Sequence, residues 1–167
     1  MNPLIRSLKH LCTGTLALRR SFDADTLAAI EQAVKACESR HAGEIRFAVE
    51  ASLSPGALWR GQTPRDRAIE VFSTLRVWDT EHNNGVLIYV LLADHDVEII
   101  ADRGVGQPRV PAAAWESCCR VMESHFRAGR FRDGAVAGVE AVATVLAGYP
   151  PNRADAGNEL PDAPAVL

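Results

Sequence analysis

The chain has 167 residues, of which 47% are apolar and 23% are charged, and its formal net charge at pH 7 is −3. A chain of this length fits a single domain that buries about two-thirds of its unfolded surface without disulfides or structural metals. Because the balance of charge is slightly acidic, we expect no nucleic-acid partner. The longest apolar run, Val86–Ala93, is far shorter than the roughly 20 residues that a helix needs to cross a bilayer, so no transmembrane segment is predicted.

Cysteine usage and the first residues of the chain indicate a cytoplasmic protein. The four cysteines show no C-x-x-C spacing, which favours reduced thiols over zinc or redox chemistry. They are Cys12, Cys37, Cys118 and Cys119. The basic N-terminus lacks the continuous apolar core of a signal peptide, because His10 and the segment Thr13–Thr15 interrupt it.

Two helical segments are predicted before the first strand. Asn2 followed by Pro3 is typical of a helix start, and leucines at helical spacing follow, which predicts a helical extension over residues 1–22. Asp23 is a second N-cap candidate. Apolar residues at three- and four-residue steps after it predict a helix that ends near His41.

The next segment predicts a strand, a loop and a helix. From Glu44 the apolar residues alternate, which indicates a strand with one half-polar face. Residues 52–62 contain proline and glycine and are predicted to form a loop. Thr63 and Pro64 then start a helix that stops before Trp78.

The central part of the chain predicts a hairpin. Asn83–Gly85 favours a turn that tolerates positive φ, and the continuous apolar run after it suits a central strand covered on both faces. A two-residue turn at Asp94 and His95 leads into Asp96–Asp102, which predicts an antiparallel partner strand. Together with the first strand this predicts an α/β domain with a mixed sheet, in which the strand–helix–strand unit is parallel and right-handed.

Two further helices complete the domain, which is predicted to span residues 23–150. One ends at Gly129, and the other begins at an Asp133 cap and stops at Gly148. The polar, proline-rich tail of residues 151–167 is predicted to be disordered.

Four oxygen-bearing side chains are predicted to meet where the parallel strands begin. If Ala93 and Asp96 flank the hairpin turn, Asp102 lies opposite Leu87, close to the entrance of the central strand. The predicted set is Glu44, Asp79, Asn84 and Asp102. Their oxygens, beside the glycines of residues 104–106, are hard ligands that suit Ca²⁺ or Mg²⁺. The same residues also fit plain structural roles, as a turn cap, a left-handed turn residue and two solvated strand ends, and both interpretations stay open.

Other kinds of site are not supported by the spacing of residues. Residues 79–85 are similar to an EF-hand loop, but the glycine is one place late and Val90 replaces the terminal carboxylate. Gly104–Gly106 is half of a dinucleotide fingerprint, with Arg109 in place of the third glycine. The serines lack a G-x-S-x-G elbow, so no catalytic residue is named. We therefore expect no nucleotide or haem cofactor.

Several short motifs occur in order along the chain. They are Gly43-Glu44-Ile45, Asn84-Gly85-Val86-Leu87-Ile88, the stretch from Val97 to Gly104, and the helix junction of Phe126, Gly129, Phe131 and Gly134. In this combination the chain resembles the TPM domain family, which is named from thylakoid-lumen and photosystem-repair relatives and is also common in bacteria. The resemblance runs from about Asp23 to Pro150.

The resemblance implies a three-layer α/β/α sandwich with a short mixed sheet. Members of the family are associated with divalent-cation binding, weak acid phosphatase activity or assistance to membrane-protein assemblies. Without a clear signal peptide or membrane tail, this chain is similar to a cytoplasmic bacterial branch of the family.

Three functions follow as alternatives. The first is an accessory or assembly role with Ca²⁺ or Mg²⁺ held at the sheet edge. The second is a weak metal-assisted acid phosphatase. The third is a protein-interaction module without a cation site, which uses the apolar helices or the basic segment Arg127–Arg132.

Overall fold

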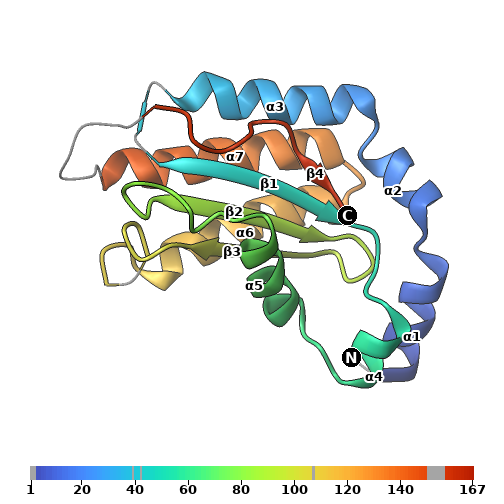
Figure 1. The fold of residues 1–167 in the computed structure, drawn as a ribbon. Coiled ribbons are helices and arrows are strands. Elements are labelled where there is room, and N and C mark those ends of the chain that lie inside the picture. Colours follow the sequence, from blue (N-terminus) through green and yellow to red (C-terminus); the bar gives the residue numbers. More distant parts are fainter. Residues whose placement is uncertain (1–2, 39, 42, 107, 150–156) are drawn as a thin grey trace.

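The computed structural model describes residues 3–38, 40–41, 43–106, 108–149 and 157–167 and folds them into three layers (Figure 1). Its elements are α1 (Pro3–Cys12), α2 (Thr15–Ser21), α3 (Ala24–Glu38), β1 (Glu44–Glu50), α4 (Pro55–Trp59), α5 (Pro64–Thr74), β2 (Gly85–Leu91), β3 (Asp96–Ala101), α6 (Ala112–Arg127), α7 (Phe131–Gly148) and β4 (Ala165–Val166). Helices α3, α6 and α7 lie on one face of the sheet and α5 lies on the other, which confirms the predicted α/β/α sandwich.

The sheet has the order β3-β2-β1-β4 and is mixed. Strands β1 and β2 are parallel, with Glu44 paired to Gly85 and Glu50 to Leu91. Strand β3 is antiparallel to β2, and the short β4 is parallel to β1. Strand β2 is therefore flanked by a strand on each side, as its continuous apolar run predicts.

Alternation along β2 divides the core into two parts. One cluster lies under α3, α6 and α7 and contains Val86, Ile88 and Val90. The alternate residues of the strand pack in the cluster under α5, and they are Leu87, Tyr89 and Leu91. All seven residues of β2 are buried. Within the described residues, no helix is both long and apolar enough to span a membrane.

The turn between β2 and β3 differs from the sequence prediction. Leu91 pairs with Asp96, so four residues connect the strands and not two. His95 adopts a positive φ of 52°, and its N–H donates to the carbonyl of Leu92 at 3.1 Å. The longer turn shifts the register, and Leu87 pairs with Ile100. The predicted pairing of Leu87 with Asp102 was therefore wrong by two residues.

Two helix boundaries also differ. The predicted loop 52–62 contains α4, because Ser54 caps it by accepting a hydrogen bond from the N–H of Ala57 at 3.2 Å. Helix α7 begins at Phe131, so Asp133 lies in its first turn and does not cap it. The predicted extension forms two helices, α1 and α2, and its N-cap candidate Asn2 lies outside the described residues.

The end of the chain is described over residues 157–167 and packs along β1, although the sequence predicts a disordered tail. Arg46 donates to the carbonyl oxygens of Pro161, at 2.6 Å, and Ala163. The N–H of Leu167 then donates to the carbonyl of Val49 at 3.0 Å. The tail thus gains backbone partners from the edge of the sheet, a type of contact that composition does not reveal.

Substitution of Gly85 tests the close contact between the start of β2 and the segment before it. A Cβ at this position would collide with the carbonyl oxygen of Val77, which belongs to the segment between α5 and β2. We predict that Gly85→Ala lowers the free energy of unfolding by about 1–3 kcal/mol, because either that segment or β2 must shift. Urea unfolding measures the change.

Gly148→Ala is the matched control, since a Cβ there meets no heavy atom within 4 Å. We expect it to be neutral or to stabilise by up to about 1 kcal/mol, because alanine favours a helix over glycine. Equal loss of stability in the two variants would contradict the close contact at Gly85.

Candidate functional site

The amino edge of the sheet is defined here by Glu44, Gly85 and Asp102. Glu44 pairs with Gly85 on one side, and the N–H of Asp102 donates to the carbonyl of Gly85 at 2.9 Å on the other. Strand alternation places both carboxylates on the face that carries Ala48 and Ile100, under α5. Because neighbouring strands lie about 4.8 Å apart, their Cα atoms are separated by about 10 Å.

Asp102 has one carboxylate oxygen that is satisfied and one that is not. Its Oδ1 accepts a hydrogen bond from the N–H of Arg103 at 2.7 Å. Its Oδ2 is buried and accepts no hydrogen bond from any residue that the structure describes. An unsatisfied buried acceptor costs on the order of 1–3 kcal/mol, and more when it is charged. A cation or a hydrogen-bond donor beside this oxygen would therefore be stabilising.

Glu44 holds the end of the chain. Its Oε2 accepts hydrogen bonds from the N–H groups of Glu159, at 3.2 Å, and Leu160, at 3.1 Å. The Glu159 carboxylate in turn accepts from the N–H of Glu81 at 2.9 Å. Glu44 thus links β1 to the tail, and the tail to the segment before β2.

The other two residues of the predicted set are Asn84, whose carbonyl accepts from the N–H of Glu44 at 3.1 Å, and Asp79. Asn84 is 2% exposed and its N–H donates to Oγ1 of Thr80 at 3.1 Å. Strand alternation places Asn84 on the opposite face from Glu44 and Asp102. Asp79 is exposed in the turn that follows α5. Among the described residues, no group of three or more histidines, cysteines, aspartates or glutamates is placed to hold a metal ion.

Two loops pack closely beside Asp102. Arg103 donates to Oδ1 of Asn83 through Nε at 3.0 Å and Nη2 at 2.7 Å. The N–H of Gly104 donates to the Asn83 carbonyl at 2.8 Å, and a Cβ on Gly104 would collide with that carbonyl and with the carbonyl of His82. The absence of a side chain at Gly104 therefore lets the two loops approach closely and brings the carbonyl oxygens of His82 and Asn83 near the amino edge.

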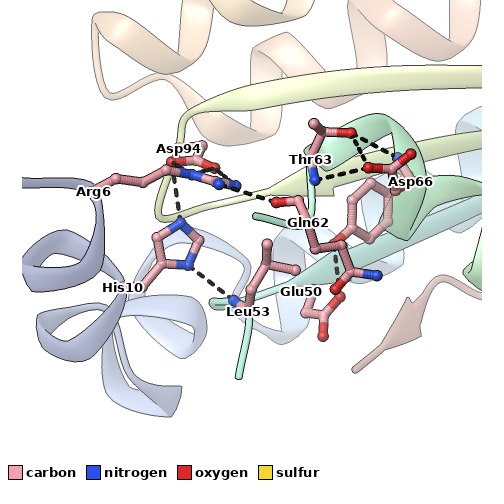
Figure 2. Close-up of polar contacts among 9 residues, drawn as sticks. Arg6, His10, Glu50, Leu53, Gln62, Thr63, Asp66 and Asp94 are labelled. Atoms are coloured by element: carbon pink, nitrogen blue, oxygen red, sulfur yellow. Dashed lines mark hydrogen bonds and ion pairs between the residues drawn. The ribbon is translucent and has the colours of Figure 1, made fainter. Parts of the chain in front are cut away.

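The opposite end of the sheet, the carboxyl edge, carries a buried network that the sequence does not predict (Figure 2). Arg6 from α1 donates to the carboxylate of Asp94 through Nε at 3.0 Å and Nη2 at 2.9 Å. Nδ1 of His10 accepts from the N–H of Leu53 at 2.9 Å, and its Nε2 lies 3.1 Å from Oδ1 of Asp94. The side chains of His10 and Asp94 are 1% and 6% exposed. This network fixes α1 to the hairpin turn.

A groove of about 820 Å³ lies beside this network, between α1 and α4. Leu11, Leu58 and Trp59 line it, with Glu50 and Ser52 among its polar residues. His10 also lines it, but both ring nitrogens already face Leu53 and Asp94, so it is not positioned as a base for a serine. The groove therefore offers apolar surface and no activated nucleophile of the serine–histidine type.

Glu50 at the end of β1 has two strong partners. The Tyr89 hydroxyl donates to its Oε2 at 2.6 Å, and Arg67 donates through Nε at 2.9 Å and Nη2 at 3.1 Å. Burial, followed by the Glu50 carboxylate, raises the pKa of Tyr89, so the phenol stays protonated. The bond to Glu50, followed by that to Glu70, raises the pKa of Arg67 against the opposing effect of burial. These contacts support a structural role for Glu50.

Asp96, which pairs with Leu91 at the start of β3, has a raised pKa. Burial contributes most, and the carboxylates of Glu98, Glu123 and Asp94 add to it, which raises the pKa to about 6. The folded protein therefore holds a proton on Asp96 over a range of pH in which the unfolded chain releases it.

A pH series tests this assignment. Because the folded state binds more protons between about pH 4 and pH 6, the contribution of Asp96 to the free energy of unfolding falls as pH rises through that window. We predict that Asp96→Asn raises the melting temperature above that of the wild type at neutral pH, and that the gain shrinks toward about pH 4. Thermal unfolding followed by circular dichroism measures it. A gain of the same size at both ends of the window would contradict the raised pKa.

Comparison with known proteins agrees with the fold described above. A family model described as TPM domain matches residues 19–145. The NMR structure of the BA42 protein from the psychrophilic bacterium Bizionia argentinensis is 31% identical, covers 86% of this chain and 94% of that chain, and superposes with a TM-score of 0.73. The N-terminal domain of a protein from P. gingivalis is 23% identical over 70% of this chain and 71% of that one, with a TM-score of 0.54, and it supports the fold alone.

The comparison with curated proteins finds no match. The family model nevertheless covers most of the chain, and the similarity to BA42 extends over nearly the whole of that protein. As the ordered motifs predict, the chain belongs to the TPM domain family.

Proposed function

We propose that this TPM domain binds a divalent cation, Ca²⁺ or Mg²⁺, at the amino edge of its sheet and acts as an accessory domain. The observation that carries the proposal is Oδ2 of Asp102, a buried carboxylate oxygen without a hydrogen bond from the described residues. A bound cation would supply the positive charge that this oxygen lacks. In the proposal, Asp102 is the anchoring ligand.

The chemistry of the neighbouring donors suits a hard cation. Glu44 is the second carboxylate on the same face, and the backbone carbonyls near Gly85 and Gly104 add neutral oxygens. Mg²⁺ is commonly held by one or two carboxylates and keeps several waters, and Ca²⁺ accepts a flexible set of six to eight oxygens. Two carboxylates therefore suffice for a weak site. Asp79 and Asn84 stay in the proposal as further ligands that variants can test.

Glu44 supports an accessory role because, in the proposal, it both holds the tail and contributes to the cation site. In the structure, its carboxylate accepts hydrogen bonds from the N–H groups of Glu159 and Leu160. An oxygen that turned toward a cation would compete with these bonds, so ion binding and tail docking would influence each other. A domain of this kind would report the concentration of the ion through the position of its tail.

Calorimetric titration of chelator-treated protein tests the proposal. We expect Ca²⁺ or Mg²⁺ to release or absorb heat and to raise the melting temperature, by the equivalent of about 2.7 kcal/mol at an ion concentration of 100 times Kd. Asp102→Asn should abolish both effects and Glu44→Gln should weaken them. Glu116→Gln is the matched control, since its side chain is 67% exposed on α6, which covers the other face of the sheet from Glu44 and Asp102.

Two results would contradict the proposal. One is the absence of heat and of a thermal shift with either ion. The other is unchanged binding in Asp102→Asn. The same preparations also separate an accessory role from catalysis, because turnover of a generic phosphoester that is lost in Asp102→Asn would favour a metal-assisted phosphatase.

A further inference from the structure

Helix α1 presents its apolar side to solvent. Its polar residues Arg6 and His10 face the domain and contact Asp94, and the His10 side chain is 1% exposed. Ile5, Leu8 and Leu11, at three-residue steps, are 53%, 61% and 78% exposed. An amphipathic helix normally buries its apolar side, so this helix is inverted relative to its own domain.

The apolar surface continues beyond α1. Leu16 on α2 is 71% exposed, and Trp59 at the end of α4 is 92% exposed. Leu11 and Trp59 both line the groove at the carboxyl edge, whereas Ile5, Leu8 and Leu16 lie outside it. We call these five residues the N-terminal apolar surface. It is wider than the groove, and exposed patches of this kind commonly mark a binding surface.

The segment that carries most of this surface has a positive net charge. Residues 1–22 contain Arg6, Lys9, Arg19 and Arg20 and no acidic residue, although the whole chain is net acidic. Lys9, Arg19 and Arg20 are exposed, and Arg60 beside Trp59 adds a further exposed cation. Helices that lie in a lipid interface have this composition, with leucine, isoleucine and tryptophan on one side and lysine and arginine beside them.

We propose that the N-terminal apolar surface docks on the surface of an anionic lipid bilayer. The five exposed side chains come from α1, α2 and α4, and a single partner helix seated in the groove, which Leu11 and Trp59 line, would leave Ile5, Leu8 and Leu16 in water. A bilayer surface is wide enough to cover more than the groove. Pairing with a second copy of the chain would bring the exposed cations together with no acidic residue of the same segment to offset them. Anionic headgroups would attract the lysine and arginine side chains, and the acyl region would bury the leucine side chains.

The domain holds this surface in a fixed position. Two hydrogen bonds from Arg6 to Oδ2 of Asp94 secure α1, and Leu18 and Phe22, which are 2% and 3% exposed, secure the segment after it in the core. The exposed side chains therefore do not need to refold before they meet a bilayer. The surface lies at the carboxyl edge, so the proposal is independent of a cation at the amino edge.

Vesicle flotation of the full chain tests the inference. We expect the protein to float with vesicles that contain about one-third phosphatidylglycerol in phosphatidylcholine, and not with phosphatidylcholine alone. Binding should weaken as salt is raised, because headgroup attraction is screened over about 10 Å at 0.1 M. The double variant Leu8→Gln, Leu11→Gln should reduce binding by at least about tenfold. Ile69→Gln is the matched control, since Ile69 is 49% exposed on α5 and should leave binding unchanged.

Tryptophan fluorescence gives a second measurement that locates the contact. We expect a blue shift on addition of anionic vesicles that is lost in Trp59→Phe and kept in Trp78→Phe, since Trp78 is half exposed outside the surface. Circular dichroism of each variant establishes that the fold is intact.

Several results would overturn the inference. Equal flotation with neutral vesicles would exclude the electrostatic contribution. A concentration-dependent dimer that Leu11→Asp dissociates would show that a second copy covers the surface. A monomer that fails to float with anionic vesicles would leave an acidic protein surface as the occupant that fits the charge.

Discussion

The parallel pairing of β1 with β2 runs from Glu44 opposite Gly85 to Glu50 opposite Leu91. This pairing positions the residues at both the amino edge and the carboxyl edge of the sheet. Because β2 is buried along its whole length, a slip of one residue would turn its apolar side chains toward the wrong helices. Gly85 matters at the start of this strand, since only a residue without a Cβ lets the Val77 carbonyl lie against the sheet. The register then brings Glu44 and Asp102 to one face, on either side of that glycine.

The two ends of the sheet differ in chemistry. The amino edge gathers carboxylate and carbonyl oxygens, with a buried oxygen of Asp102 that lacks a donor among the described residues. At the carboxyl edge, in contrast, Arg6 and His10 surround the carboxylate of Asp94. Burial makes this second network sensitive to the loss of one partner, because a remaining charge would be left without compensation. The amino edge is therefore where the cation is proposed to bind, and the carboxyl edge holds α1 in place.

Local patterns predict the longer helices, β1 to β3 and their order, because the 3.6-residue and two-residue periods are properties of neighbouring residues, whereas α4 and β4 were missed. The hairpin register was predicted two residues off because Leu92 and Ala93 are apolar and extend the strand pattern, and the positive φ of His95 leaves no signal in the sequence. Even so, Asp102 lies beside the start of β2. The contact between Arg6 and Asp94 was missed because 88 positions separate them, and only the folded chain brings them together. Strand alternation directs the Asn84 side chain away from the face of Glu44, while the Asn84 carbonyl accepts from the N–H of Glu44 at 3.1 Å.

A crystal structure determined in the presence of Ca²⁺ or Mg²⁺ tests the central claim most directly. The account predicts an ion within about 2.6 Å of Oδ2 of Asp102, with Glu44 or backbone carbonyls completing its oxygen ligands. An ordered water or a donor side chain bonded to that oxygen, with no ion at the amino edge, would contradict it.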